Sequence, residues 1–295
     1  NRLCGSSMQV MHTAAGMIAR DWGDLFLCGG VESMSRIQRG GFNRSPSPTL
    51  EKLMPDAYIS MGLTAENVAS RYNISRVRQE EFALNSHQKA IKAKSDGKFI
   101  NEVKSINIQG TNQQIGHEVD GCMRESTLEA MAGLKPAFTD EGVVTAATSS
   151  PLTDGACFSL IASEKAVEQH NLTPMARIVS AAVSGVNPDE MGLGPIPSTK
   201  LALKRAGITV EELDVIELNE AFSSQSLACI EELNLTMENI NIDGGSIAIG
   251  HPLGASGARI VGKTASLLQR TGGKYGLATM CIGGGMGIAT ILERV

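Results

Sequence analysis

The sequence has few aromatic residues and no excess of basic ones. Trp, Tyr and Phe make up 4% of its 295 residues, and 26 Lys and Arg stand against 31 Asp and Glu, a formal net charge of −5. Nucleic-acid-binding domains usually carry a basic footprint, and basic clusters also attract proteins to anionic membranes. The composition therefore supports neither kind of binding, and we expect no nucleic-acid partner.

Long apolar runs and closely spaced metal ligands are also missing. No stretch approaches the roughly 18 apolar residues that suggest a membrane-spanning helix, so we predict no membrane span. The six cysteines form no CxxC pair, and His251 has no cysteine at zinc-binding spacing, so we predict no metal site. Such scattered cysteines do not suggest a secreted disulfide framework, and we expect a reducing, cytoplasmic environment.

Glycine and methionine are abundant instead, with 32 and 13 residues, and helix-like and strand-like segments alternate along most of the chain. Helical spacing from Met8 to Ile18 precedes a short apolar strand, Leu25–Cys28, that ends at Gly29-Gly30. The alternation predicts an α/β fold with a largely internal sheet. A similar helix and glycine-terminated strand near the end of the chain hint at duplicated domains.

The later segments are assigned in the same way. We predict a strand at 142–150, followed by a turn, a second strand and a helix up to 171. Further strands are predicted at 176–185, 213–219, 275–283 and 285–293, a strand and turn at 240–250, and helices at 198–208, 220–233 and 254–270.

A polar stretch from Ser35 to about Leu134 interrupts this alternation. It contains a clear amphipathic helix in the segment 75–99. One face of that helix carries Phe82, Ser86, Ala90 and Ala93. We interpret residues 35–150 as an insertion that packs over a site rather than as a second folding nucleus.

Cys4 stands in the stretch NRLCGSSMQ, at the predicted N-terminus of the first helix. Unpaired N–H groups and the helix dipole favour an anion there, and the small residues Gly5, Ser6 and Ser7 leave room for a substrate. The residue is a candidate nucleophile. The alternative is a small buried apolar side chain, which is the usual role of a free cysteine.

His251 lies between Gly250 and Pro252 in GGSIAIGHPLGASGAR. Pro252 suits the first position of a helix, which would hold His251 at a second helix N-terminus as a base or hydrogen-bond donor. A turn or capping histidine is the alternative.

Cys281 ends a predicted strand and runs into the three glycines 283–285. Such a turn can expose backbone N–H groups to an oxyanion, although a tight hairpin with an incidental cysteine explains it equally well. Asn219, in VIELNEAF, falls where a strand gives way to a helix. It suits an N-cap, or its amide could point into a site.

Residues 257–264 match the phosphate-binding pattern GxxxxGK[ST]. That pattern requires a loop between a strand and a helix, whereas this match lies inside a predicted helix. We therefore predict no nucleotide site there.

The stretches NRLCGSSMQ, NEAF, GHPLGASGAR and CIGGGMG together resemble the thiolase family, in its order and at about its spacings. The resemblance covers the whole chain and is greatest to the 3-ketoacyl-CoA thiolases of bacterial fatty-acid β-oxidation. It implies a fold of duplicated α-β-α layers, with two similar mixed-sheet domains and a loop-domain insertion.

The implied boundaries are 1–34 and 151–172 for the N-terminal domain, 35–150 for the loop domain and 173–295 for the C-terminal domain. The loop domain would form a wall of the CoA site and contacts between subunits. In the family about ninety residues precede NRLC, which implies that the first part of the N-terminal domain is missing here.

The resemblance also implies roles for individual residues. Cys4 would take up the acyl group, and Cys281 would be the second, acid/base cysteine. His251 would activate Cys4 and form one oxyanion hole with Asn219 through a water molecule, while the backbone N–H groups of Cys4 and Gly283 would form the other. The residues implied to contact the pantetheine arm or the thioester are Ser150, Met61, Phe138, Met191 and Phe222.

The implied reaction is ping-pong cleavage of a 3-ketoacyl-CoA by CoA through an acyl-cysteine. This reverse Claisen step needs a soft nucleophile, donors aimed at the enolate oxygen, and an acid that can later deprotonate a thiol. Two thiols, an imidazole and an amide meet these needs. CoA would be a co-substrate, with no permanently bound cofactor.

Three alternatives stay open. A biosynthetic acetyl-CoA acetyltransferase often carries histidine directly before the methionine that matches Met61, where this chain has Ser60. A ketoacyl-synthase-type enzyme usually pairs two histidines with one cysteine, whereas only His251 has a suitable motif here. A non-catalytic subunit is the third. Expected partners are acyl-CoA, a second or further copies in a homodimer or tetramer, and the hydratase/dehydrogenase subunit of a β-oxidation complex.

Overall fold

The computed structural model describes residues 1–37, 41–43, 45–107, 116–117 and 120–295, so parts of the predicted 35–150 insertion lie outside the described residues. The longer helices are α1 (Ser6–Ile18), α3 (Met61–Arg71), α4 (Arg76–Ser95), α7 (Pro195–Ala206), α8 (Ser223–Leu233) and α10 (Leu253–Thr271). The shorter ones are α2 (Pro48–Leu53), α5 (Leu128–Ala132), α6 (Glu164–Gln169) and α9 (Ser246–Ile249). The strands are β1 (Leu25–Ser33), β2 (Ile106–Asn107), β3 (Gly116–His117), β4 (Asp154–Ala162), β5 (Ala176–Gly185), β6 (Leu213–Leu218), β7 (Tyr275–Ile282) and β8 (Met286–Arg294).

The larger sheet is mixed and has the strand order β5-β8-β7-β6. Its outer strand β6 runs parallel to β7, while β8 is antiparallel to both β7 and β5. A second sheet pairs β1 with β4 antiparallel, from Leu25 opposite Ala162 to Ser33 opposite Asp154. The α/β class predicted from the alternating pattern is confirmed.

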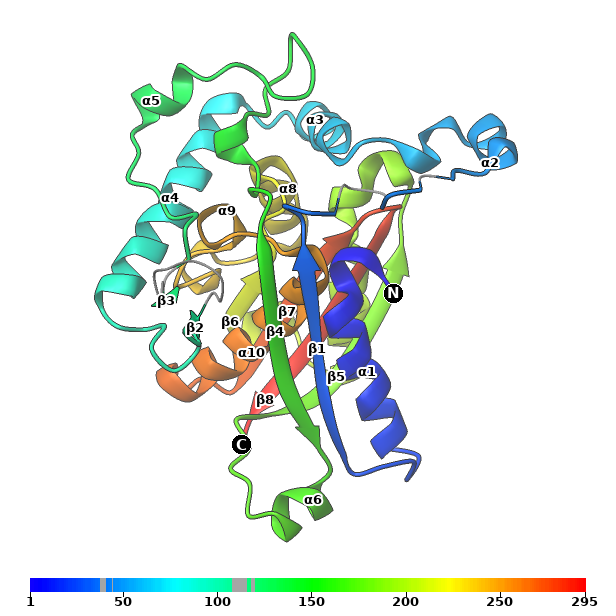
Figure 1. Cartoon of the computed structure of the whole chain (residues 1–295), viewed down its shortest axis with the longest axis vertical. Coiled ribbons are helices and arrows are strands. Elements are labelled where there is room, and N and C mark those ends of the chain that lie inside the picture. Colours follow the sequence, from blue (N-terminus) through cyan, green and yellow to red (C-terminus); the bar gives the residue numbers. More distant parts are fainter. Residues whose placement is uncertain (38–40, 44, 108–115, 118–119) are drawn as a thin grey trace.

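Helices α1 and α10 lie between the two sheets, and α7 packs on the far face of the larger sheet (Figure 1). The close approach of α1 and α10 depends on small residues. A Cβ atom added at Gly257 of α10 would lie 2.5 Å from the backbone nitrogen of Met8 in α1. This packing brings the N-terminal ends of both helices to the same side of the molecule.

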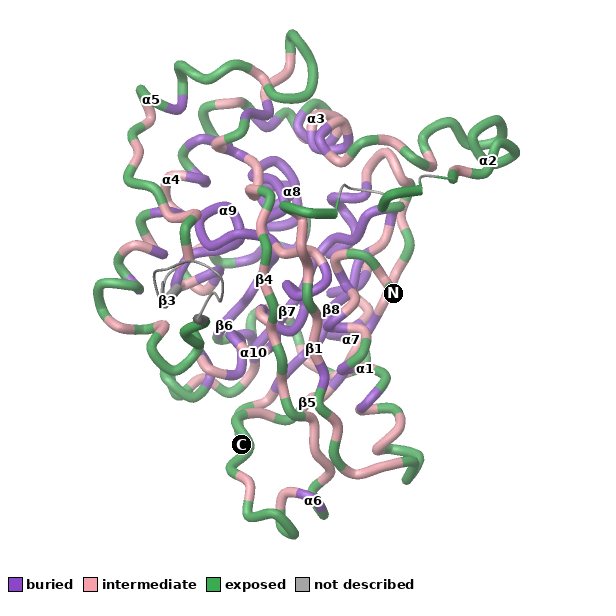
Figure 2. Tube along the Cα trace, viewed as in Figure 1, coloured by how far each residue is buried: buried purple, intermediate pink, exposed green. Residues whose placement is uncertain are grey.

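The core is concentrated around the larger sheet and α8 to α10 (Figure 2). Neighbouring residues of β7 point to opposite faces, as a strand requires: Leu277 enters one buried cluster, and Ala278 and Met280 enter the other. Both clusters are apolar, so the larger sheet is buried on both faces.

Within the 35–150 stretch, α3 packs against α8, and α4 packs against α8 and α9 (Figure 1). Its amphipathic helix is confirmed, because α4 buries the predicted face of Phe82, Ser86, Ala90 and Ala93. In the described part of the chain, no helix is both long enough and apolar enough to cross a membrane.

Two predicted strands are wrong. Within 142–150, Ala146–Thr148 forms a 3₁₀ turn in which the backbone N–H of Thr145 donates to Thr148 Oγ1 (2.9 Å). Within 240–250, Ser246–Ile249 forms α9 instead of extended chain. A short apolar run looks alike as a buried strand or a buried helical turn, so its tertiary hydrogen bonds decide between them.

Candidate active site

Cys4 lies in a 3₁₀ turn, Leu3–Gly5, that leads directly into α1. Leu3 has a φ of +46°, a left-handed conformation that is uncommon outside glycine and often marks functional sites. The turn packs against the end of β7, since a Cβ atom added at Gly5 would lie 2.4 Å from Ile282 Cδ1. Cys4 therefore stands beside the segment that carries Cys281.

Cys281 is 1% exposed and precedes the last residue of β7. Burial raises the pKa of its thiol, and the nearby Cys4 contributes to the increase. The two cysteines thus interact electrostatically, although 277 positions separate them in the sequence (281 − 4). Cys281 is held as a neutral thiol, a state that can donate a proton.

The glycines after Cys281 form the hairpin between β7 and β8. Gly284 and Gly285 have φ values of +86° and +85°, which other residues rarely adopt. Gly283 lies next to the Cys4 turn and α3: Leu3 Cδ1 and Met61 Sδ are 3.3 and 3.4 Å from the position of an added Cβ. The segment is therefore a tight hairpin that also lies against Leu3, the residue before Cys4.

His251 is buried between α9 and α10. Pro252 is the N-cap of α10 and not its first helical residue as predicted, because its ψ of 99° is extended. The ring nitrogen Nδ1 lies 2.6 Å from Ser256 Oγ, whose own hydroxyl donates to the Pro252 carbonyl (3.0 Å). Because a hydroxyl has a single proton to donate, Ser256 must accept from Nδ1–H, which leaves Nε2 with a free lone pair.

The protonation state of His251 follows from the same environment. Burial lowers its pKa to about 3, and the Arg259 charge acts in the same direction. At neutral pH the imidazole is therefore uncharged, with Nε2 able to accept a proton or a hydrogen bond.

Asn219 is fully buried at the C-terminal end of β6. The N-cap alternative is wrong, since α8 begins at Ser223 and Phe222 is its cap residue. The Asn219 amide nitrogen instead lies 3.4 Å from His251 Nε2, and its backbone N–H donates to the Thr279 carbonyl of β7 (3.0 Å). Asn219 thus links His251 to the strand of Cys281.

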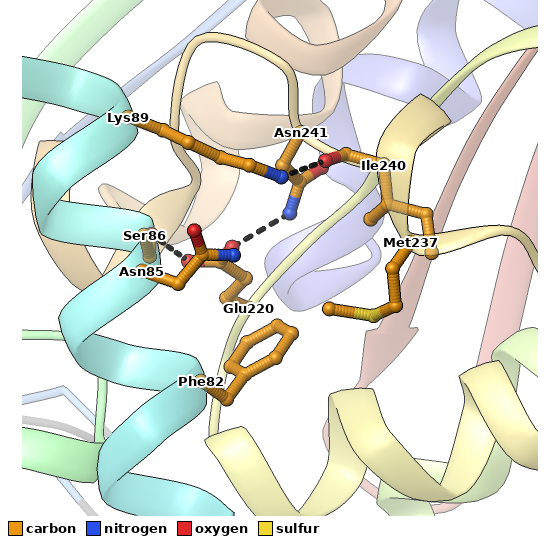
Figure 3. Close-up of a pocket in the computed structure, with 8 residues that line it drawn as sticks. All are labelled: Phe82, Asn85, Ser86, Lys89, Glu220, Met237, Ile240 and Asn241. Atoms are coloured by element: carbon orange, nitrogen blue, oxygen red, sulfur yellow. Dashed lines mark hydrogen bonds between the residues drawn. The ribbon is translucent and has the colours of Figure 1, made fainter. Parts of the chain in front are cut away.

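Glu220 anchors the turn that carries Asn219 (Figure 3). Its carboxylate accepts hydrogen bonds from Ser86 Oγ (2.6 Å), Asn241 Nδ2 (2.7 Å) and the backbone N–H of Ile247 (3.1 Å). Burial raises the pKa of this carboxyl group. The turn is therefore tied both to α4 and to α9.

Four of the five residues predicted to line the pocket lie together. Met61, Met191 and Phe222 share one apolar cluster with Cys281, and Phe138 packs edge-to-face on Phe222 with ring centroids 5.9 Å apart. Ser150 lies at the border of this cluster, where its backbone N–H donates to the Ala221 carbonyl (3.0 Å).

The sequence analysis missed four polar residues around His251 and Asn219. Thr153 Oγ1 accepts a hydrogen bond from the backbone N–H of His251 (3.1 Å). Ser256 bonds to the His251 ring, Ser246 bonds to the Asn219 side chain, and Arg259 bonds to Ser246. One of them could have been found from the sequence, because Ser256 carries a hydroxyl five positions after His251 in the same motif.

The phosphate-binding pattern has no loop, as expected. Residues 257–264 lie within α10, and Lys263 pairs with Asp243 (2.6 Å) and Glu102 (2.9 Å). Among the described residues no group of three or more His, Cys, Asp or Glu is placed to hold a metal ion.

Comparison with known proteins defines the class of protein as an acyltransferase. Residues 1–165 match the family model "Thiolase, N-terminal domain", and residues 172–294 match "Thiolase, C-terminal domain". The chain belongs to the thiolase family and has its two-domain fold of mixed sheets and helices.

Named relatives agree with this assignment. The chain is 46% identical to the 3-ketoacyl-CoA thiolase of Marinobacter nauticus over 100% of its own length and 77% of the relative's. It is similar to the crystal structure of human mitochondrial 3-ketoacyl-CoA thiolase, with a TM-score of 0.91 and 40% identity; the match covers 100% of this chain and 78% of the human one. A crystal structure of the human enzyme in complex with CoA is similar as well. The acetyl-CoA acetyltransferase of Bacillus anthracis matches with a TM-score of 0.90, 37% identity and coverage of 100% and 78%.

Proposed function

We propose that the chain catalyses the cleavage of 3-ketoacyl-CoA by CoA, giving acetyl-CoA and an acyl-CoA shortened by two carbons. The observation that carries this proposal is the contact between a neutral His251 and the Asn219 amide at the end of β6. The backbone of Asn219 is hydrogen-bonded to β7, the strand that carries Cys281, and Cys281 in turn interacts with Cys4. The names of the relatives support the same reaction.

In the first half-reaction, His251 Nε2 takes the thiol proton of Cys4, the Cys4 thiolate adds to the C3 ketone, and the C2–C3 bond breaks. The electron pair moves into an acetyl-CoA enolate, whose thioester oxygen accepts hydrogen bonds from the Nε2–H that His251 has gained and from the water molecule held by the Asn219 amide. Cys281 then gives its proton to C2. The neutral state of this buried thiol supports its assignment as the acid.

In the second half-reaction, the Cys281 thiolate takes the proton of an incoming CoA thiol. The CoA sulfur attacks the acyl-Cys4 carbonyl, and the oxyanion binds to the backbone N–H groups of Cys4 and Gly283. Breaking the bond between the acyl group and the Cys4 sulfur releases acyl-CoA and a Cys4 thiolate, which takes back its proton from His251. CoA is a co-substrate in this scheme, and the reaction requires no permanently bound cofactor.

The proposed pocket is apolar at its reactive end. Met61, Phe138, Met191 and Phe222 line the thioester end, in keeping with their shared cluster, and Ser150 contacts the pantetheine arm. We further propose the boundaries 1–34 with 151–172, 35–150 and 173–295 for the N-terminal, loop and C-terminal domains.

The proposed setting is cytoplasmic fatty-acid β-oxidation. The chain would act as a homodimer or tetramer, with loop-domain contacts between subunits, and would receive its substrate from a hydratase/dehydrogenase subunit. The names of the bacterial relatives support the degradative role.

The test measures cleavage of a long-chain 3-ketoacyl-CoA together with the intact mass of the protein. Wild type should gain one acyl group on Cys4 in the absence of CoA, and Cys4→Ala should lose at least about 10³-fold in kcat. The matched control is Cys28→Ala, which removes a buried cysteine of β1 and should retain activity within a few-fold. Absence of the acyl-enzyme, or equal loss in both variants, would overturn the proposal in favour of a non-catalytic subunit.

A biosynthetic acetyl-CoA acetyltransferase is the second candidate, supported by the match to the Bacillus anthracis enzyme. Such an enzyme would act on acetoacetyl-CoA and not on long-chain substrates. A kcat/KM that rises with acyl length favours the degradative thiolase, and strict preference for the four-carbon substrate favours the alternative.

A further inference from the structure

A buried chain of hydrogen bonds runs from Asn219 away from the proposed reaction centre. Ser246, at the start of α9, is fully buried, and its hydroxyl donates to Asn219 Oδ1 (2.6 Å). The Arg259 guanidinium, from α10, donates through Nη2 to the Ser246 oxygen (3.2 Å). Neither Ser246 nor Arg259 has a role in the chemical steps above.

The hydrogen bonds in this series run in one direction. A guanidinium can only donate, so the Ser246 oxygen accepts from Arg259, and the Ser246 hydroxyl donates its single proton to Asn219 Oδ1. The Asn219 NH₂ group must then face His251 Nε2, which is 3.4 Å away and carries the free lone pair. Arg259 in turn lies 3.8 Å from the Glu217 carboxylate, which is buried in β6.

We propose that Ser246 and Arg259 are positioning residues, which fix the orientation of the Asn219 amide so that it presents hydrogen-bond donors to the reaction centre. The inference rests on the proposed function. An amide has two orientations related by a half-turn, and the terminal torsion of asparagine separates them only weakly. The wrong orientation would direct an oxygen at the His251 lone pair and at the enolate oxygen.

The two half-reactions separate this role from a general structural one. Ser246→Ala should lower kcat for cleavage about tenfold, the loss expected for one disordered donor. It should leave KM within about twofold, because no contact with the substrate is removed. Exchange of labelled CoA into acetyl-CoA places its oxyanion in the Cys4 and Gly283 hole and not beside Asn219, so its rate should change by less than about twofold.

The matched control is Ser198→Ala, which removes another fully buried hydroxyl, one that bonds only to backbone carbonyls at the start of α7. The control should affect neither half-reaction. In the Asn219→Ala background, Ser246→Ala should have no further effect on cleavage, since a positioning residue acts through its target. Equal effects of Ser246→Ala and Ser198→Ala, or additivity with Asn219→Ala, would overturn the inference.

A measurement without catalysis keeps the two proposals distinguishable. Nitrogen-15 NMR of histidine-labelled protein, with His251 assigned by His251→Gln, reports whether Nε2 accepts a hydrogen bond. Ser246→Ala should move the Nε2 signal toward that of a free lone pair, and Ser198→Ala should not; an unchanged signal contradicts the inference. A wild-type chain that neither cleaves nor exchanges contradicts the proposed function, while the NMR comparison still decides this one.

Discussion

At the scale of single residues, burial gives Cys281 and His251 the same outcome from opposite shifts. A charged form is penalised away from water, so burial raises the pKa of the Cys281 thiol and lowers that of His251 to about 3. Both groups are neutral at neutral pH. Cys281 and His251 therefore become charged only during the reaction, when a group of opposite charge forms beside them.

A titration tests the state of His251. The folded pKa lies below the ordinary value of 6.5, so the ring should stay uncharged from pH 8 down to about 5. We expect its carbon-bound proton signals, assigned with His251→Gln, to stay constant in NMR spectra over that range. A midpoint near the ordinary value would show that water reaches the ring.

At the scale of elements, the site depends on how closely α1 approaches α10. The Cys4 turn leads into α1 and His251 precedes α10, so the packing of these helices sets the spacing of the two residues. Gly257 lies at the contact, where an added Cβ would come within 2.5 Å of the Met8 backbone. A backbone atom cannot move aside as a flexible side chain can.

Two glycine substitutions in α10 should therefore have opposite effects. Gly257→Ala should destabilise the fold by about 1–3 kcal/mol, because the helices must separate. Gly262→Ala is the matched control: its added Cβ meets only Ser159 Oγ at 3.7 Å, and alanine favours a helix by about 0.5–1 kcal/mol. Urea unfolding measures both; a Gly257→Ala protein as stable as the control would show that the helix contact is adaptable.

At the scale of the whole molecule, buried ionisable groups connect the β6 strand to α10. Burial raises the pKa of Glu217 from 4.5 to about 8, and Arg259 and Lys263 oppose this increase. The charged groups that act on Glu217 are Arg259, Lys263, Asp243 and Glu220. The folded state thus binds the Glu217 proton more tightly than the unfolded chain does.

The sign of the pH effect follows. A raised folded pKa contributes stability that is complete below the unfolded value of 4.5 and is lost as pH rises through about 8. Glu217→Gln removes this titration while keeping the shape of the side chain. From pH 5 to pH 9 we expect the melting temperature of wild type to fall by several degrees relative to Glu217→Gln; parallel curves would contradict the buried, proton-binding state.

The sequence by itself determined the α/β class, the amphipathic α4 and the motifs that contain Cys4, His251 and Cys281. These features are local: a strand or helix period, a proline after histidine and a glycine turn after a strand all act within a few residues. The same stretches were sufficient to indicate the thiolase family, which the family models confirm.

Only the tertiary structure decided what Asn219 bonds to and which residues surround it. From sequence, Asn219 suited a helix cap, and the Ser246 segment suited a strand. The hydrogen bonds that overrule both readings join distant positions, such as Gly245 N–H to Ser86 Oγ, 159 residues apart (3.0 Å). A polar group buried without a partner is costly, so the backbone adopts the conformation that satisfies such contacts, and no local pattern reveals a partner that only folding brings near.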